Sequence, residues 1–219
     1  MKMIIIIKFG VFQMQNTDKI IEDNHARFLE RKNLYKSHGY DIDEERAFII
    51  EKAGPLNGKI LEAGMGKGYL TLALAGLGYP LTTFDISEEE QRFARENIKY
   101  AGLDHLVDFR IENGEQLSFK DKTFNWVFLV NTIHHLVNPY RVVDELIRVL
   151  EPKGKLVLSD FNKRGFDLMD EIHAVEERTH ERGNVMLPEI LNYLRKRDFI
   201  ISSHQTQFQE MAVACRAIG

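Results

Sequence analysis

The sequence predicts an α/β fold, a doubly wound and mainly parallel sheet with helices on both faces and an antiparallel C-terminal edge. Two patterns predict it. Between residues 59 and 160, short apolar runs typical of strands alternate with helical patterns, as in parallel sheets with crossover helices. After them, strand-like runs at 198–204 and 207–216 follow each other closely, which predicts an antiparallel pair. Such sheets bind ligands outside the carboxyl ends of their strands, so functional side chains are expected there.

The sequence predicts helices and strands that follow one another along the chain. The expected helices before the first strand are 17–36 and 43–53. The expected parallel strands are 59–63, 80–85, 106–111, 124–130 and 154–160, and the later helices are 68–77, 88–100, 139–150, 167–181 and 188–197. Ser87 is the expected N-cap of the helix after it, because its hydroxyl can accept from a backbone N–H of the first turn. Asn138 and Pro139 suit the N-cap and first position of another helix.

The most informative stretch is Lys59-Ile-Leu-Glu-Ala-Gly-Met-Gly-Lys-Gly68, a strand-like run followed by glycines at alternate positions. Gly64, Gly66 and Gly68 have no Cβ atom, so the backbone can take positive φ and approach a ligand closely. The following helix would direct its N-terminal N–H groups at the same place. This combination predicts a turn that holds a nucleotide-like cofactor.

The spacing of the glycines narrows the class of cofactor. The dinucleotide fingerprint G-x-G-x-x-G would need a glycine at position 69, where the chain has Tyr69. A nicotinamide oxidoreductase is therefore disfavoured. The next strand-like run, Leu81-Thr-Thr-Phe-Asp85, ends in an acid 21 positions after Gly64. A carboxylate at that strand end can accept hydrogen bonds from both hydroxyls of a ribose.

With its E-x-G-x-G-x-G turn and Asp85, the sequence resembles the class I S-adenosylmethionine-dependent methyltransferases over about residues 40–160. The resemblance implies a Rossmann-like core, S-adenosylmethionine as the cofactor and a small molecule as the methyl acceptor. It also implies that Glu62, Gly64, Gly66 and Gly68 hold the cofactor and that Asp85 binds its ribose.

A third motif stands where this family brackets the adenine. The stretch is Asn113-Gly-Glu-Gln-Leu-Ser-Phe119, with Asn113 in place of the usual acid and Ser118 in place of the usual proline. The resemblance makes Asn113, Gly114 and Glu115 expected cofactor contacts.

A fourth motif, from Phe124 to Leu136, resembles the fourth strand and its following turn, where the family often carries a similar His-His-Leu. Asn131 is a further expected cofactor contact, and Asn125 stands where the family usually has Asp. Asn138-Pro-Tyr140 is similar to a motif of amine methylases but lies seven residues after Asn131, so the start of a helix is favoured there.

The chemistry follows from the cofactor that the resemblance implies. An activated methyl group needs a nucleophile placed in line with the S–CH3 bond and water excluded. A general base is needed if the acceptor is a hydroxyl or an acidic carbon, and histidine suits neutral pH. We expect His135 and Asp160 to be catalytic. His134 is the adjacent candidate, and capping the next helix or packing against the sheet is the alternative for either histidine.

The segment 160–187 is expected to face the substrate, because the family commonly carries an insertion at this point. On a helix, His173, Glu176 or Glu177, and His180 would share one face and could hold a divalent metal. A solvated helical face is favoured, so no metal site is predicted.

Residues 1–53 are expected to be an N-terminal extension with lid helices, and 54–219 the cofactor-binding core. Tyr40 is the expected lid contact, because an aromatic ring can cover a sulfonium by a cation–π contact. A packing helix is the alternative. The apolar segment from Met1 to Phe12 is too short to span a membrane. It is interpreted either as an added edge strand or as non-native sequence upstream of a start at Met14.

Composition bounds the functions that remain. Net charge is −4 and Lys and Arg are dispersed, which argues against a dedicated nucleic-acid binder. Cys215 is the single cysteine, so an internal disulfide cannot form and a reducing cytoplasm is the expected compartment. A membrane partner is not expected either. The sequence therefore predicts a cytoplasmic S-adenosylmethionine-dependent methyltransferase for a small molecule. The alternative is a non-catalytic S-adenosylmethionine-binding sensor or scaffold.

Overall fold

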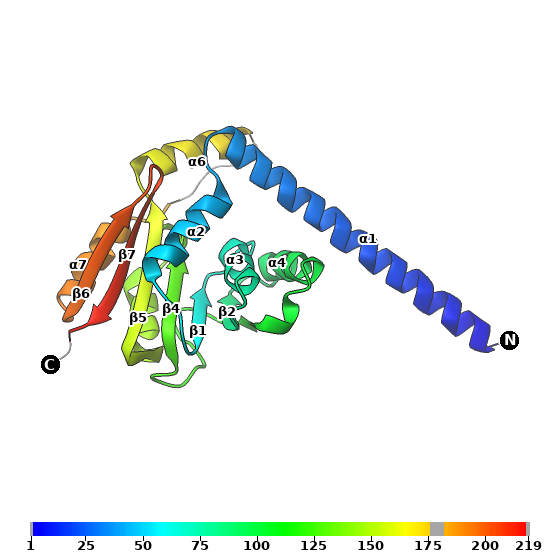
Figure 1. Ribbon diagram of the computed structural model, residues 1–219, viewed down its shortest axis with the longest axis horizontal. Helices are drawn as coiled ribbons and strands as arrows, with labels where there is room; N and C mark the ends of the chain where they lie inside the picture. The colour runs from blue at the N-terminus through cyan, green and yellow to red at the C-terminus, as the bar shows by residue number, and fades with distance from the viewer. Residues whose placement is uncertain (1, 176–181, 218–219) are drawn as a thin grey trace.

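The computed structural model describes the backbone of residues 2–175 and 182–217, and side chains from Lys19 onward within those ranges. This part of the chain folds around a seven-stranded sheet in the order β3-β2-β1-β4-β5-β7-β6 (Figure 1). The strands are β1 Ile60–Ala63, β2 Leu81–Asp85, β3 Val107–Ile111, β4 Phe124–Val130, β5 Leu150–Phe161, β6 Phe199–Gln205 and β7 Gln209–Arg216. The first five strands pair in parallel, whereas β7 runs antiparallel to both β5 and β6. The predicted fold class is confirmed.

The helices alternate with the strands as the sequence predicts. They are α1 Lys2–Ser37, α2 Ile42–Ala53, α3 Tyr69–Gly76, α4 Glu88–Tyr100, α5 Pro139–Val149, α6 Lys163–Val175 and α7 Leu187–Arg195. Two short 3-10 turns, Asp104–Leu106 and Ile133–His135, complete the assignment for the described residues. The hydroxyl of Ser87 accepts from the Glu90 N–H at 3.2 Å, so Ser87 caps α4 as expected.

Two apolar layers cover the two faces of the sheet. Alternate residues of the central strands point to opposite faces, which divides the core. On one face, Leu61, Leu129 and Leu158 pack with the buried sides of α5 and α7. On the other face, Ile60, Phe128 and Val157 pack with α2 and α3. The central strands are therefore buried on both sides, which accounts for their near-continuous apolar sequence.

The strand order reverses between β1 and β4. From β1 the chain passes outward to β2 and β3, then crosses back to β4 on the other side of β1. The register aligns Ala63 with both Phe84 and Leu129, so the carboxyl ends of β1, β2 and β4 lie together. Such a reversal leaves a crevice at the strand ends where ligands bind.

Several expectations differ from the structure at the ends of elements. The start of the chain is no edge strand: Lys2–Ser37 is one helix, and no proline interrupts it. Helix α6 begins at Lys163, four residues before the expected 167. Asn138 stands at the N-cap of α5, but its side chain makes no capping bond and its Nδ2 donates to Glu115 Oε1 instead at 2.9 Å.

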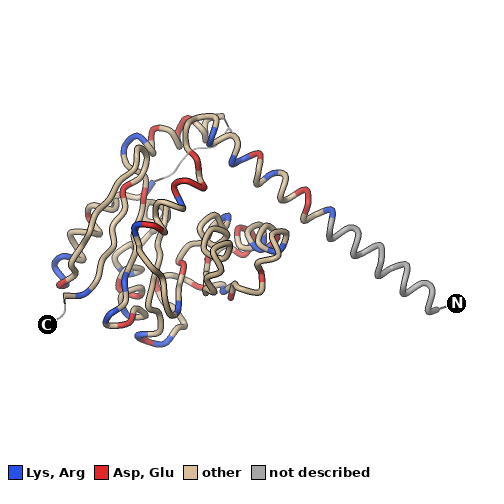
Figure 2. Tube along the Cα trace, in the orientation of Figure 1, with Lys and Arg blue, Asp and Glu red and all other residues tan. Residues whose placement is uncertain are grey.

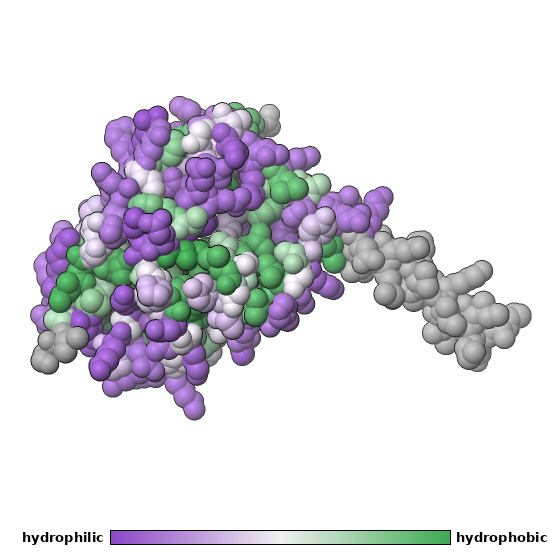
Figure 3. Space-filling view, in the orientation of Figure 1, coloured by the Kyte–Doolittle hydropathy of each residue, from purple (hydrophilic) through white to green (hydrophobic). Residues whose placement is uncertain are grey.

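The surface shows how polar and apolar residues are distributed. Acidic and basic residues are interspersed along the described part of the chain (Figure 2). Apolar residues gather across the middle of the face in Figure 3, with more hydrophilic residues above and below. Within the described residues, the helices are all too short or too polar to cross a membrane.

Candidate active site

A cavity of about 570 Å³ lies at the carboxyl ends of β1, β2 and β4. Its walls come from the turns after these strands and after β3, and from α1, α2 and α6. Most of the site residues expected from the sequence line it: Tyr40, Glu62, Gly64, Gly66, Asp85, Asn113, Gly114, Glu115, Asn131 and His135. Gly68 and Asp160 are not among the lining residues.

Gly66 is the glycine whose missing side chain leaves room in the cavity. Its φ is +48°, and a Cβ built on it would meet no atom within 4 Å. Gly68 differs, because a Cβ there would lie 2.9 Å from the Cβ of Ala94 on α4. Gly66 therefore leaves open space for a ligand, whereas Gly68 permits the close packing of the α3 N-terminus against α4.

Asp85 joins the glycine turn to the end of β2. One carboxylate oxygen accepts from the Gly66 N–H at 2.8 Å, and the other accepts from the Ser87 N–H at 2.9 Å. These two bonds fix the carboxylate beside the turn, and carboxylate oxygens have further lone pairs for ligand hydroxyls.

Glu62 is a buried carboxyl at the end of β1, only 3% exposed. Its Oε2 accepts from the hydroxyls of Thr71 on α3 and Thr83 on β2, the latter at 2.9 Å. Burial raises the pKa of this carboxyl from its ordinary 4.5 to about 7, although the two threonines and the charge of Arg46 oppose the shift. Glu62 therefore changes charge near neutral pH.

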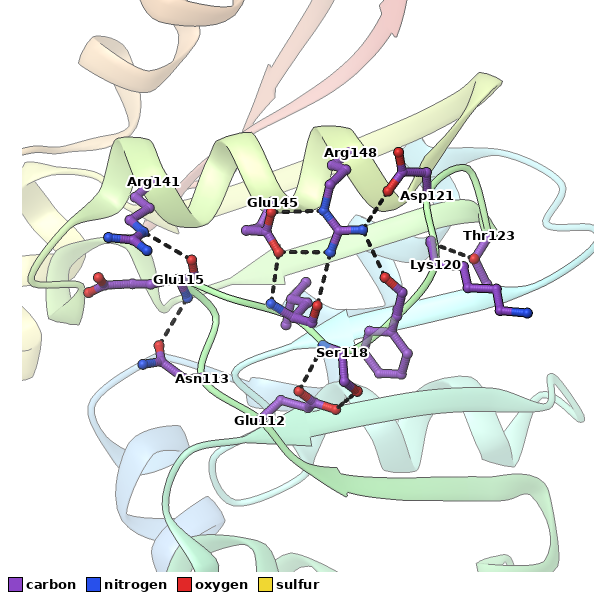
Figure 4. A network of polar contacts seen from close by, with 12 residues as sticks. Glu112, Asn113, Glu115, Ser118, Lys120, Asp121, Thr123, Arg141, Glu145 and Arg148 are labelled. Atoms are coloured by element: carbon purple, nitrogen blue, oxygen red, sulfur yellow. Dashed lines mark hydrogen bonds and ion pairs between the residues drawn. The ribbon is translucent and has the colours of Figure 1, made fainter.

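The turn after β3 is tied to α5 by a polar network (Figure 4). Asn113 Oδ1 accepts from the Glu115 N–H at 3.0 Å, and Arg141 donates to the Glu115 carbonyl at 3.1 Å. Further along, Arg148 donates to the carbonyls of Leu117 and Phe119 at 3.0 and 2.8 Å. The segment that presents Asn113 and Gly114 to the cavity is therefore held in place by α5.

A histidine and an aspartate form a buried pair at the ends of β4 and β5. His134 Nδ1 lies 2.6 Å from Asp160 Oδ1, and both residues are 1% exposed. The His134 N–H also donates to Asp160 Oδ2 at 3.2 Å. His134 lines the cavity and Asp160 does not, so Asp160 can influence a ligand in the cavity only through the His134 ring. His135, the expected catalytic histidine, is exposed and also lines the cavity, with ring centroids 4.0 Å from His134.

Three residues on the other side of the cavity form a second polar group. Tyr40, 1% exposed, accepts at its hydroxyl from Gln209 Nε2 at 2.5 Å and from Arg46 Nη1 at 3.4 Å. Arg46 is 6% exposed and lines the cavity, and no carboxylate of a described residue forms an ion pair with it. Sequence patterns gave no reason to select Gln209, because it lies in the C-terminal strand far from the recognised motifs.

Asn125, where the family usually has Asp, lies away from this cavity. Its Oδ1 accepts from the Lys59 N–H at 2.8 Å, at the amino ends of β1 and β4. A Cβ on Gly58 would lie 2.1 Å from the same oxygen. This departure from the family pattern therefore concerns the packing of the turn before β1, at the end of the sheet opposite the cavity.

The expected metal-binding face falls mostly outside the described residues. Glu176, Glu177 and His180 lie in the undescribed segment, whereas His173 on α6 lines the cavity. Among described residues, no group of three His, Cys, Asp or Glu side chains could hold a metal ion.

Residues 61–158 match the family model of a methyltransferase domain. The chain is 34% identical over 137 residues to a phosphatidylethanolamine N-methyltransferase of Cereibacter sphaeroides, covering 62% of this chain and 67% of that protein. It is 28% identical over 134 residues to the ubiquinone/menaquinone biosynthesis C-methyltransferase UbiE of Shewanella pealeana, covering 59% and 53%. The chain spans about half the length of such UbiE relatives.

Solved structures agree on the fold. The crystal structure of the cyclase SpnF superposes with a TM-score of 0.65 over 81% of each chain, at 17% identity. That likeness concerns the arrangement of the sheet and helices, since one fold hosts several chemistries. The family model and the 34% identical relative carry the assignment: the chain belongs to the class I S-adenosylmethionine-dependent methyltransferases.

Proposed function

We propose that this protein transfers a methyl group from S-adenosylmethionine to a small-molecule acceptor. One observation carries the proposal: a single cavity joins the Gly66 turn and Asp85 to the His134–Asp160 pair. A cofactor turn and a proton-accepting side chain thus meet at one place, as methyl transfer to a protonated acceptor requires.

The residues present fit the cofactor. Open space beside Gly66 admits a ligand next to the backbone, and the fixed Asp85 carboxylate can accept from ribose hydroxyls. Asn113 and Gly114 line the same cavity, which supports the proposal that they bracket the adenine. Arg46, a buried cation on the cavity wall, suits the carboxylate of the cofactor's amino-acid part.

When bound, S-adenosylmethionine supplies an activated methyl group, so the chain needs no nucleophile of its own. Asp160 accepts the Nδ1 proton of His134, which leaves Nε2 as the basic nitrogen of that ring. We assign the base to His134, oriented by Asp160. His135, exposed at the cavity wall, would contact the acceptor.

The acceptor is proposed to lie between the strand ends and the elements that cover them. Tyr40, from the 1–53 extension, and Met169 and His173, from the 160–187 segment, all line the cavity. Tyr40 is buried among Tyr35, Phe161 and Phe208, so its ring forms a fixed part of this wall. These two segments are therefore expected to select the acceptor.

Isothermal calorimetry tests the cofactor. S-adenosylhomocysteine should bind and NAD should not, because the glycine spacing and Asp85 suit one ribose. Tighter binding of NAD would contradict the proposal. Release of S-adenosylhomocysteine during a screen of small metabolites then tests catalysis. Cofactor binding without turnover on any metabolite would favour the non-catalytic sensor or scaffold instead.

A further inference from the structure

Gln209, the first residue of β7, lies behind the cavity wall and is 1% exposed. Its Nε2 donates to Tyr40 Oη at 2.5 Å and to Asn131 Oδ1 at 3.0 Å. Its Oε1 accepts from the Ser159 hydroxyl at 2.9 Å. Tyr40 and Asn131 line the cavity, whereas no described residue of β6 or β7 does. The antiparallel edge of the sheet therefore contacts two cavity-lining residues through the amide of Gln209.

Asn131 is held in a conformation that few residues adopt. Its φ is +52°, a left-handed value that asparagine tolerates better than most residues. Its N–H donates to the Ser159 carbonyl at 2.8 Å, and Gln209 holds its side-chain oxygen. Burial raises the pKa of the Tyr40 hydroxyl, and a side-chain hydrogen bond from Asn131 is among the contacts that oppose this shift. An amide carries two N–H groups, so the second N–H of Asn131 is the part of this side chain that remains for a ligand.

Arg46 adds donors on the same side of the cavity. Its Nη1 donates to the Tyr40 hydroxyl, the oxygen that also accepts from Gln209. Guanidinium and amide N–H groups in one wall suit an oxygen atom of a ligand, a carboxylate oxygen best.

We propose that Gln209 is a positioning residue of this site. By holding Asn131 Oδ1 and Tyr40 Oη, it directs an N–H of the Asn131 amide at an oxygen atom of the bound ligand. The inference rests on the proposed function, because the ligand in question is S-adenosylmethionine or its product.

The substitution Gln209→Glu reverses the polarity that Gln209 presents. A carboxylate has only acceptors, so Asn131 would turn its N–H groups toward residue 209 and its oxygen toward the cavity. The Tyr40 hydroxyl can donate to the new carboxylate, so the contacts are re-formed with opposite direction. S-adenosylhomocysteine affinity should fall at least about tenfold, as for loss of a hydrogen bond to a charged group.

Two further variants keep the test decisive. Gln205→Glu makes the same chemical change at an exposed position of the neighbouring strand and should leave affinity unchanged. Gln209→Met removes the hydrogen bonds to Tyr40, Asn131 and Ser159 without adding charge. It should also weaken S-adenosylhomocysteine binding, and it replaces the Glu variant in the test if that variant does not fold. Thermal unfolding of each variant separates loss of binding from loss of structure.

A double-mutant cycle with Asn131→Ala tests whether Gln209 acts through Asn131. The two affinity losses should be strongly non-additive, because removing the Asn131 amide removes what Gln209 positions. Additive losses, or unchanged affinity in the folded Gln209 variants, would overturn the inference. Methylthioadenosine, which lacks the amino-acid part of the cofactor, serves as a second probe. If the Gln209 variants bind it as tightly as the wild-type protein does, the ligand oxygen that Asn131 contacts belongs to the carboxylate of the cofactor. Failure of the wild-type protein to bind S-adenosylhomocysteine would instead contradict the proposed function.

Discussion

His134 Nδ1 lies 2.6 Å from Asp160 Oδ1, and each of these residues is 1% exposed. A buried carboxylate in this position fixes the tautomer and the orientation of the ring. Because His134 and not Asp160 lines the cavity, substitution of the aspartate should act through the histidine.

Asp160→Asn should lower kcat by about a hundredfold or more, the usual contribution of an oriented general base. S-adenosylhomocysteine affinity should stay near the wild-type value, since neither residue lies in the glycine turn. His135→Ala and His173→Ala should likewise impair turnover more than cofactor affinity. The matched control is His105→Ala, at an exposed position outside the cavity. Wild-type kcat and acceptor KM in all three variants would place the acceptor elsewhere.

Asp85→Ala should weaken S-adenosylhomocysteine binding by about 1–3 kcal/mol, because charge-assisted hydrogen bonds to the ribose are lost. Calorimetry measures the change. Asp108→Ala is the control, since Asp108 lies on the adjacent strand and pairs with Arg110 at the surface. An affinity equal to wild type would remove Asp85 from the site.

Gly66→Val should abolish cofactor binding and leave the fold largely intact. Gly102 is a matched control, with φ +71° and open space around the position of a Cβ, but outside the cavity. Valine is strained at either left-handed position, so both variants should lose stability. Only the Gly66 variant should lose binding; native circular dichroism together with native affinity would contradict the placement of the turn.

Glu62 should make stability depend on pH between about 4.5 and 7. Below this range both states hold the proton. As pH rises through it, the unfolded state releases a proton that the folded state retains, so the folded state loses relative stability. The full shift corresponds to roughly 3 kcal/mol. Thermal unfolding of wild type and Glu62→Gln at pH 5 and pH 8 checks this: the variant's relative Tm should rise with pH. A pH-independent difference between the two proteins would contradict it.

Arg148→Ala should destabilise the protein by about 1–3 kcal/mol and also weaken cofactor binding, because the Leu117 and Phe119 carbonyls lose their donor. Neighbouring carboxylates, Glu145 first and then Asp121, hold the pKa of this guanidinium above its ordinary value. The control Arg195→Ala removes an exposed arginine whose side chain donates to Asn192 Oδ1 at 3.0 Å. Unchanged affinity in a destabilised Arg148 variant would show that the Asn113–Gly114 turn holds its shape alone.

The sequence by itself determined the sheet, the glycine turn and the strand that ends in Asp85. Apolar periodicity and glycine spacing are local properties, and they place each motif at a strand end before any packing is known. Local capping was predictable for Ser87, but Asn138 has a stronger partner in Glu115, a residue 23 positions away that no local pattern indicates.

Tertiary structure decided which side chains reach the cavity. His134 and His135 are adjacent and chemically identical, and only the 3-10 turn at Ile133–His135 turns the first of them toward Asp160. Gln209 meets Tyr40 across 169 positions of sequence because β7 inserts between β5 and β6. Motifs are set by neighbours along the chain, whereas the pairing of buried polar groups depends on contacts that exist only after the sheet has formed.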